Sequence, residues 1–142
     1  MNIFDSMSFP ILNQWIQKEK IGSQVGLLSW AVWDEKDLNS FNKFLRDFIE
    51  DEFMIRLNDK HILLRDFVIG KFREWFRMPF LDSNDFMSFF KKEHVMFELW
   101  KNHFNDFDEI VFLDDTVGDI TMECDGRILR LVDAKKLTKR SL

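Results

Sequence analysis

DITMECDGRILRLVD, the sequence of residues 119–133, shows where the chain is β-rich and how two of its strands are joined. Apolar and polar residues alternate on both sides of Asp125-Gly126, a dipeptide that is typical of the two-residue turn of a β-hairpin. The segment EIVFL, a little upstream, adds a third β-rich run. The sequence therefore predicts an antiparallel meander of three short strands at the C-terminal end. The predicted strands are residues 109–113, 119–124 and 127–132.

Two registers of the predicted hairpin are possible, and they differ in which side chains share a face of the sheet. With a two-residue turn, Met122 lies opposite Leu129 and Ile120 lies opposite Leu131, so the apolar side chains gather on one face. A three-residue loop with a bulge instead places Asp119 opposite Leu131. We expect the two-residue register because it packs the apolar residues together.

Upstream of the predicted strands, the apolar residues recur at intervals of three and four, which is typical of helices. Pro10 is tolerated in a first helical turn, Asp34 is a suitable N-cap, and Pro79 ends a helix. The stretch QVGLLSWAVW is ambiguous: Val, Trp and Gly favour a strand, whereas Leu28 and Val32 also fit a helical stripe. We expect it to be a strand or extended. The predicted helices are residues 8–20, 34–57, 61–78 and 83–104, and the predicted extended segment is residues 24–33.

These elements predict an α+β fold with about four N-terminal helices packed on a C-terminal three-stranded antiparallel meander. A chain of 142 residues, with 46% apolar and 32% charged residues, has the size and composition of one globular domain. We therefore expect a single domain over residues 1–142, of which residues 134–142 form a basic tail that is flexible, pairs with the acidic residues of the same chain or contacts a partner. The basic residues of the tail are Lys135, Lys136, Lys139 and Arg140.

A single cysteine, Cys124, excludes an internal disulfide and a cysteine-rich metal site, which suits a reducing compartment. The first residues lack the charged start and apolar run of a secretory signal, and the longest nearly apolar run, residues 25–33, is too short to span a bilayer. We therefore expect a cytoplasmic protein that does not bind membranes. The net charge of −5 argues against direct nucleic-acid binding, which needs clustered Lys and Arg.

The common patterns of histidine metal sites, cysteine nucleophiles and phosphate-binding loops are missing from the sequence. His61, His94 and His103 are not spaced by three or four residues, as metal ligands on one helix face are, and Cys124 has no neighbouring base to activate it as a nucleophile. Phosphate-binding glycine loops and the serine-nucleophile elbow are also missing. The sequence thus predicts no cofactor and no metal, and an enzyme is the less favoured class of function.

The sharpest feature is the charge of residues 106–125, which contain eight acidic residues and no Lys or Arg. One interpretation is a solvated surface of acidic loops and strand edges that keeps the protein soluble. The other is a surface that docks on a basic protein, because complementary charge speeds encounter and fixes orientation. The predicted contact residues are Glu109, Asp114, Asp115, Asp119 and Glu123.

A small acidic protein with a docking surface and no catalytic motif is what we expect of an inhibitor. The predicted function is therefore a non-catalytic acidic binding protein, namely an immunity protein that neutralises a basic bacterial toxin such as a nuclease. A structural subunit that binds through an exposed aromatic patch is an alternative, since the chain has 17 Phe and 5 Trp. The sequence leaves the oligomeric state and the role of the basic tail open.

The order of residues 119–135 also resembles the core of the PD-(D/E)xK nucleases, in which an acid on one strand and an acid-x-lysine on the next bind a divalent metal ion. The resemblance implies that Asp119 and Asp133 are metal ligands and that Lys135 stabilises charge at the scissile phosphate. Both carboxylates must lie on one face, which the three-residue loop provides. The two-residue turn instead pairs Asp119 with Val132 and leaves Asp133 on the opposite face.

Overall fold

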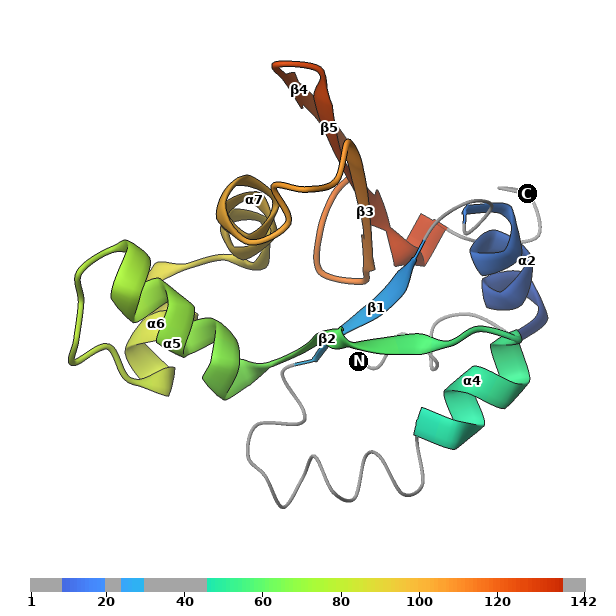
Figure 1. The fold of residues 1–142 in the computed structure, drawn as a ribbon, viewed down its shortest axis with the longest axis horizontal. Coiled ribbons are helices and arrows are strands. Elements are labelled where there is room, and N and C mark those ends of the chain that lie inside the picture. Colours follow the sequence, from blue (N-terminus) through green and yellow to red (C-terminus); the bar gives the residue numbers. More distant parts are fainter. Residues whose placement is uncertain (1–8, 20–23, 30–45, 137–142) are drawn as a thin grey trace. The chain divides into compact units, whose positions relative to one another are not determined.

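The computed structural model describes residues 9–19, 24–29 and 46–136 (Figure 1). The predicted cap Asp34 and residues 30–33 of the predicted extended segment lie outside the described residues, as do residues 137–142 of the predicted tail. The described helices are α2 (Phe9–Glu19), α4 (Asp47–Phe53), α5 (Arg65–Trp75), α6 (Ser83–Phe89), α7 (Lys92–Asn102) and the short 3-10 helix η2 (Ala134–Lys136). The described strands are β1 (Val25–Ser29), β2 (Leu57–Leu64), β3 (Glu109–Asp114), β4 (Ile120–Cys124) and β5 (Arg127–Asp133).

The chain divides into two compact units. The N-terminal unit comprises Asn13–Phe86 and contains β1, α4, β2 and α5. The C-terminal unit comprises Met1–Leu12 with Met87–Leu142 and contains α7, the strands β3, β4 and β5, and η2. The single domain predicted from the sequence is not tested by this division and stays a prediction.

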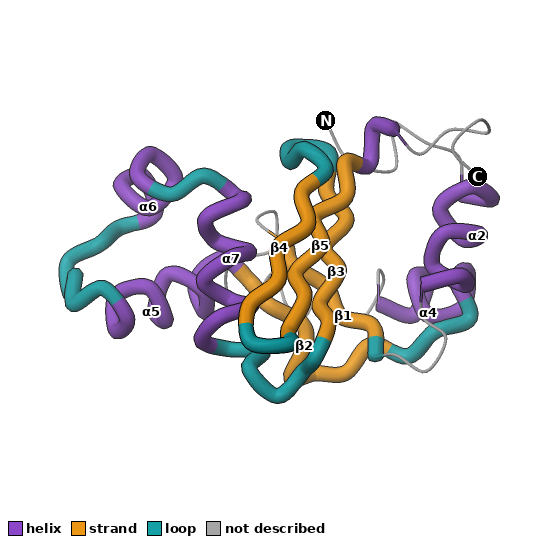
Figure 2. Tube along the Cα trace, turned by 90° about the horizontal axis from the view of Figure 1, so that it is seen from above, coloured by secondary structure: helices purple, strands orange, loops and turns teal. Residues whose placement is uncertain are grey.

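The predicted fold class is wrong in its number of helices and in its sheets, although the described part of the chain is mixed α+β. The described part of the chain has five α-helices and two sheets (Figures 1 and 2). One sheet is a parallel pair of strands, β1 with β2, and the other is a mixed three-stranded sheet in the order β3-β5-β4. The connection from β3 to β4 spans the end of β5 and buries Val117, which is 3% exposed. The predicted antiparallel meander is absent because β5 lies between β3 and β4 and runs parallel to β3.

The individual elements agree with the sequence where the pattern is local. The helix predicted over residues 8–20 is confirmed by α2, and the strand within residues 24–33 is confirmed by β1. The end predicted at residue 57 is wrong, since α4 ends at Phe53 and Met54 turns out of it with a left-handed φ of 52°. The helix predicted over residues 83–104 is two helices, because Lys91 has an extended backbone between α6 and α7.

The parallel pair in the N-terminal unit depends on a close approach of β1 to β2. Leu27, Leu28 and Ser29 pair with successive residues of β2, and the register shifts between Val25 and Leu27. Gly26 lies at this shift, where a Cβ would come within 2.5 Å of the carbonyl oxygen of His61. Only a residue without a side chain fits this position without displacing the backbone of β2.

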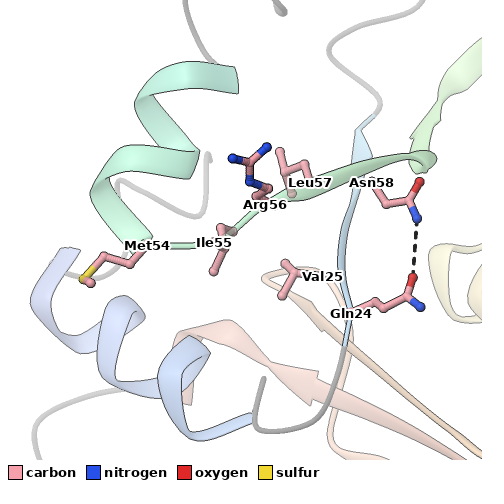
Figure 3. A pocket seen from close by; sticks show the side chains of 7 residues that line it. All are labelled: Gln24, Val25, Met54, Ile55, Arg56, Leu57 and Asn58. Carbon is pink, nitrogen blue, oxygen red and sulfur yellow. Dashed lines mark hydrogen bonds between the residues drawn. The ribbon is translucent and has the colours of Figure 1, made fainter.

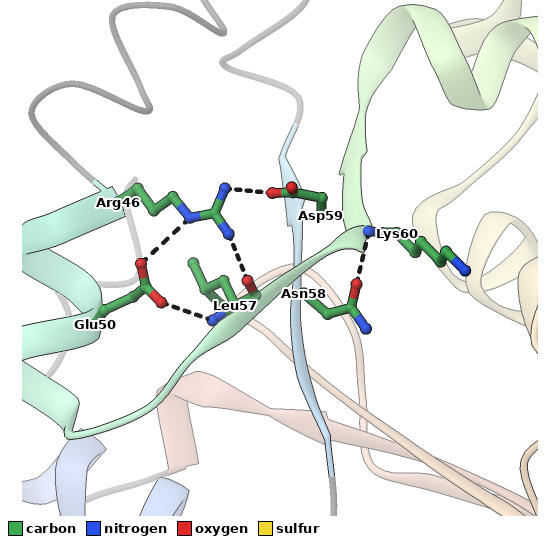
Figure 4. Close-up of polar contacts among 6 residues, drawn as sticks. All are labelled: Arg46, Glu50, Leu57, Asn58, Asp59 and Lys60. Atoms are coloured by element: carbon green, nitrogen blue, oxygen red, sulfur yellow. Dashed lines mark hydrogen bonds and ion pairs between the residues drawn. The ribbon is translucent and has the colours of Figure 1, made fainter.

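Arg46 joins the start of α4 to β2 in the same unit (Figure 4). Its guanidinium donates to the Glu50 carboxylate over 3.2 Å, to the Leu57 carbonyl oxygen over 2.6 Å, and to the carboxylate of Asp59. Glu50 also accepts a hydrogen bond from the backbone N–H of Leu57 over 3.1 Å. The hydrogen bond to Asp59 is the main reason that the pKa of Arg46 is raised. These residues form a structural bridge, since every charge in it already has a partner within the unit.

The core of the N-terminal unit is built on phenyl rings. Phe53, Phe72 and Phe86 are almost completely buried, and the rings of Phe72 and Phe86 meet edge to face with centroids 5.1 Å apart. Arg73 donates to the carbonyl oxygen of Leu81 over 2.7 Å and so holds the loop that follows α5. The absence of tyrosine leaves this core without hydroxyl groups that would need partners.

The hairpin of the C-terminal unit has the predicted register. Cys124 pairs with Arg127, Met122 with Leu129, and the pairing continues without a shift to Ile120 and Leu131. The turn residues Asp125 and Gly126 both have positive φ angles, 53° and 80°, as a type I′ turn requires. The two-residue turn expected from Asp125-Gly126 is therefore confirmed. Helix α7 packs on β5, whose Leu129 is fully buried.

Candidate binding surface

The strand order divides the acidic segment between the two edges of the sheet. β5 lies between β3 and β4, and it carries Arg127 and Arg130 into the middle of the sheet. The predicted meander would have placed the acids of β3 directly beside those of β4. The acidic residues therefore form separate groups, which differ in their exposure and in their partners.

Glu109 and Glu123 lie on the same face of the sheet. Both pair with Ile128, Glu109 from the β3 side and Glu123 from the β4 side, so the three residues form one row. Both carboxylates are exposed. The next row on this face has Arg130 at its centre, between Val111 and Thr121. This face is therefore mixed in charge near β5 and acidic towards its edges.

Asp114 lies in a half-buried ion pair. Its carboxylate contacts Lys92 Nζ of α7 at 2.5 Å, and only 12% of its side chain is exposed. It also accepts hydrogen bonds from the backbone N–H and the hydroxyl group of Thr116. Burial acts to raise the pKa of Asp114, but the hydrogen bonds and charge of Lys92, together with Thr116, outweigh it and lower the pKa. This carboxylate ties α7 to the end of β3.

The ion pair predicts a defined pH dependence for an Asp114→Asn variant. Because the folded pKa of Asp114 is below its unfolded value, its stabilisation is present above about pH 4 and is lost as the pH falls through the folded pKa. At pH 7 the variant should be less stable by about 1–2 kcal/mol. The difference from the wild type, measured by urea unfolding, should shrink below about pH 4. A difference that is constant across this range would contradict the ion pair as its cause.

Asp119 lies just before β4 and is bonded within the chain. Its carboxylate accepts a hydrogen bond from the backbone N–H of Asp133 over 2.8 Å and contacts Lys136 Nζ at 3.3 Å. The hydrogen bond from Asp133 is the main reason that the pKa of Asp119 is lowered, and Lys136 adds to it. Asp119 remains largely exposed, whereas Asp115 is half-buried. Asp119 thus supports the end of β5 and still faces solvent.

The hairpin from Asp119 to Gly126 is exposed at every residue. It holds three acidic residues, Asp119, Glu123 and Asp125, and no basic residue. Ile120 and Met122 project on the face that buries Leu129 and Leu131 of β5, yet each is 41% exposed. The segment therefore combines negative charge, uncovered apolar side chains and the outer edge of a sheet.

The nuclease-like arrangement would need the other hairpin register. The observed pairing, continued by one residue beyond Ile120 and Leu131, sets Asp119 opposite Val132 and leaves Asp133 on the other face. The Asp133 carboxylate accepts a hydrogen bond from the backbone N–H of Lys135 over 2.9 Å. The geometric condition for two metal ligands on one face is therefore not met by this pair.

Comparison with known proteins does not indicate a function. No protein-family model, curated protein or solved structure matches this chain. Within the three described segments, no group of three or more His, Cys, Asp or Glu side chains is placed to hold a metal ion. Of the described helices, none has both the length and the apolar character that crossing a bilayer requires. The function must therefore be inferred from the surface itself.

A hollow of about 500 Å³ lies in the N-terminal unit, beside β1 and the start of β2 (Figure 3). Gln24 and Asn58 meet at one side of it, where the Asn58 amide donates to Gln24 over 3.4 Å. Arg56 is the one charged residue of its lining, and the neighbouring Met54 is 76% exposed. A single arginine without an acidic or nucleophilic partner in the lining does not make a catalytic arrangement.

The structural role of Arg127 was not predicted from the sequence. Its guanidinium donates to the carbonyl oxygens of Trp100, Phe104 and Phe107, over 2.6, 2.9 and 3.2 Å, and lies 5.0 Å from the centre of the Trp100 ring. It thus holds the C-terminal end of α7 against β5. Its position directly after Asp125-Gly126 gives no indication of this role, because its partners are backbone groups.

Proposed function

We propose that this chain is a non-catalytic binding protein that docks on a basic protein through its acidic hairpin, Asp119 to Gly126. The observation that carries the proposal is the exposure of all residues of this hairpin, which bears three acidic residues and no basic one. Ile120 and Met122 project from the same face of the hairpin, where each is 41% exposed, and they give the acidic surface an apolar component. Glu109 adds a second acidic position on the same face, at the other edge of the sheet, with β5 and its Arg130 between the two edges.

The charge of the hairpin indicates the class of partner. Carboxylates at an exposed edge attract Lys and Arg, and complementary potential increases the rate of encounter and disfavours acidic partners. Asp114 contributes less than the exposed acids, because Lys92 already neutralises it. The main contacts in the proposal are therefore Glu123 and Asp125, supported by Asp119 and Glu109.

The biological role that fits such a surface is inhibition of a basic toxin in the cytoplasm. A nuclease binds phosphates in a basic groove, and carboxylates on a projecting hairpin can occupy that groove in their place. An immunity protein of this kind needs no catalytic residues of its own. Its affinity would come from apolar contacts of the hairpin and its specificity from the arrangement of the acids.

Neutralising the two outermost acids tests the proposal. A Glu123→Gln/Asp125→Asn variant removes two charges and keeps an asparagine at the positive φ of residue 125, which asparagine tolerates. We expect it to bind a basic partner, captured from host extract by the wild-type protein, about tenfold more weakly, equivalent to about 1.4 kcal/mol. The dependence of affinity on salt should also become less steep.

The control is Asp51→Asn/Glu52→Gln, which removes the same charges from exposed positions on α4. If both variants lose affinity equally, net charge alone is responsible and the hairpin is not the docking surface. If neither changes the affinity, the proposal is wrong. Inhibition of the partner's own activity by the wild-type protein, measured in the same preparation, tests the inhibitor role.

A further inference from the structure

We propose that the partner binds by adding an extended basic strand to the outer edge of β4. This inference rests on the proposed function and specifies how the acidic hairpin would hold its partner. Among the described residues, β5 is the only strand that pairs with β4, so the other side of β4 is an open edge. An open edge presents backbone N–H and C=O groups that an incoming strand can pair with.

The hairpin register shows which residues offer these groups. The two-residue turn makes Cys124 and Arg127 a hydrogen-bonded pair, and in an antiparallel ladder such pairs alternate with non-bonded ones. Cys124, Met122 and Ile120 therefore direct their backbone groups towards β5. Thr121 and Glu123 direct theirs outward.

Of the features that usually prevent strand addition, this edge has only acidic side chains. Edge strands are commonly protected by Pro, by Lys or by a bulge. β4 has the sequence ITMEC, without Pro or Lys, and its pairing with β5 is regular from Ile120 to Cys124. All five of its residues are exposed. Only its acids limit which strand can approach, because they repel an acidic one.

The side chains around the edge indicate a basic strand of alternating character. Ile120 and Met122 form an apolar strip on one face of β4, whereas Thr121 and Glu123 lie on the other face. A strand with apolar residues on one face and Lys or Arg on the other would place its charges beside Glu123. Asp119 and Asp125, at the two ends of β4, attract further basic residues.

A second copy of the chain fits this edge poorly. Antiparallel pairing of two β4 strands about Met122 places Asp119 opposite Asp125 at both ends, and Thr121 opposite Glu123. Like charges directly opposite one another disfavour the pairing. A basic strand meets the same acids with opposite charge, which is why the proposed occupant is a partner strand.

The test uses a short capped peptide of alternating lysine and valine, and the same peptide with alternate backbone nitrogens methylated. Both carry the same charge, but the methylated peptide cannot complete the ladder. We expect the unmethylated peptide to bind the full-length protein at least about fivefold more tightly than the methylated peptide. This difference corresponds to the loss of one or more hydrogen bonds by the methylated peptide. Alkylation of Cys124, the only cysteine of the chain, gives a local readout, since a bound strand should slow it.

A pair of protein variants tests the same edge by changing β4 instead of the peptide. Thr121→Pro removes one outward N–H and no ladder bond to β5, whereas Thr121→Val keeps the N–H. The proline variant should bind the peptide about fivefold more weakly than the valine variant. The comparison of methylated and unmethylated peptides on the wild-type protein remains decisive if the proline variant fails to fold.

Three outcomes would overturn strand addition. The first is that both peptides bind equally well and that only the Glu123→Gln/Asp125→Asn variant weakens their binding. The proposed function would then stand, with a purely electrostatic contact. The second is no binding of either peptide, in which case capture of a basic partner still decides the proposed function separately. The third is a wild-type dimer that Thr121→Pro dissociates, which would show that a second copy occupies the edge.

Discussion

Replacing Arg127 with methionine is expected to destabilise the C-terminal unit by about 3 kcal/mol, because three carbonyl oxygens lose a charged donor at once. The guanidinium reaches the carbonyl groups of Trp100, Phe104 and Phe107, and Trp100 is only 4% exposed. Methionine preserves much of the aliphatic stem but offers no hydrogen. The free energy of unfolding from urea titration is the measurement.

Two further variants separate the contribution of the Arg127 hydrogen bonds to stability from that of its positive charge. Arg127→Lys keeps the charge, but a single ammonium group cannot replace the planar fork, so an intermediate loss is expected. Lys101→Met removes a positive charge from an exposed position in the last turn of α7 and should change stability by no more than about 0.5 kcal/mol. A methionine variant as stable as the Lys101→Met variant would show that Arg127 does not hold the helix end.

The same residue shows why part of the site could not be predicted from the sequence. The Asp125-Gly126 turn and the register of Met122 with Leu129 were predicted correctly, because alternation and turn chemistry are local. The partners of Arg127 are backbone carbonyl groups, which every residue carries, so no pattern of residue types marks them. The ion pair of Lys92 with Asp114 likewise joins distant positions and depends on how α7 packs.

The errors in the fold have the same origin. Whether β3 neighbours β4 or β5 depends on the path of the connection that buries Val117, and the strand patterns are equally compatible with both orders. The run Ile62, Leu63 and Leu64 was assigned to a helix, although it ends β2. A short apolar run suits either structure, and pairing with β1 selects the strand.

Replacing Gly26 with alanine is the prediction with the largest effect in the N-terminal unit. A Cβ at this position would lie 2.5 Å from the carbonyl oxygen of His61 and 2.7 Å from its Cβ, so the backbone of β2 must move away from β1. Overpacking of this kind costs about 1–3 kcal/mol, and we expect the upper end because the obstructing atoms belong to a paired strand. Thermal and urea unfolding should both show the loss.

Gly70→Ala is the matched control, since it makes the same chemical change in the same unit. A Cβ at Gly70 would meet no atom within 4 Å beyond its chain neighbours and the backbone of its own helix. The position lies within α5, where alanine is favoured over glycine by about 1 kcal/mol. The two substitutions should therefore change the free energy of unfolding in opposite directions. If Gly26→Ala were neutral or stabilising as well, β1 and β2 would not approach each other as closely as the pairing of Leu27 with Ile62 requires.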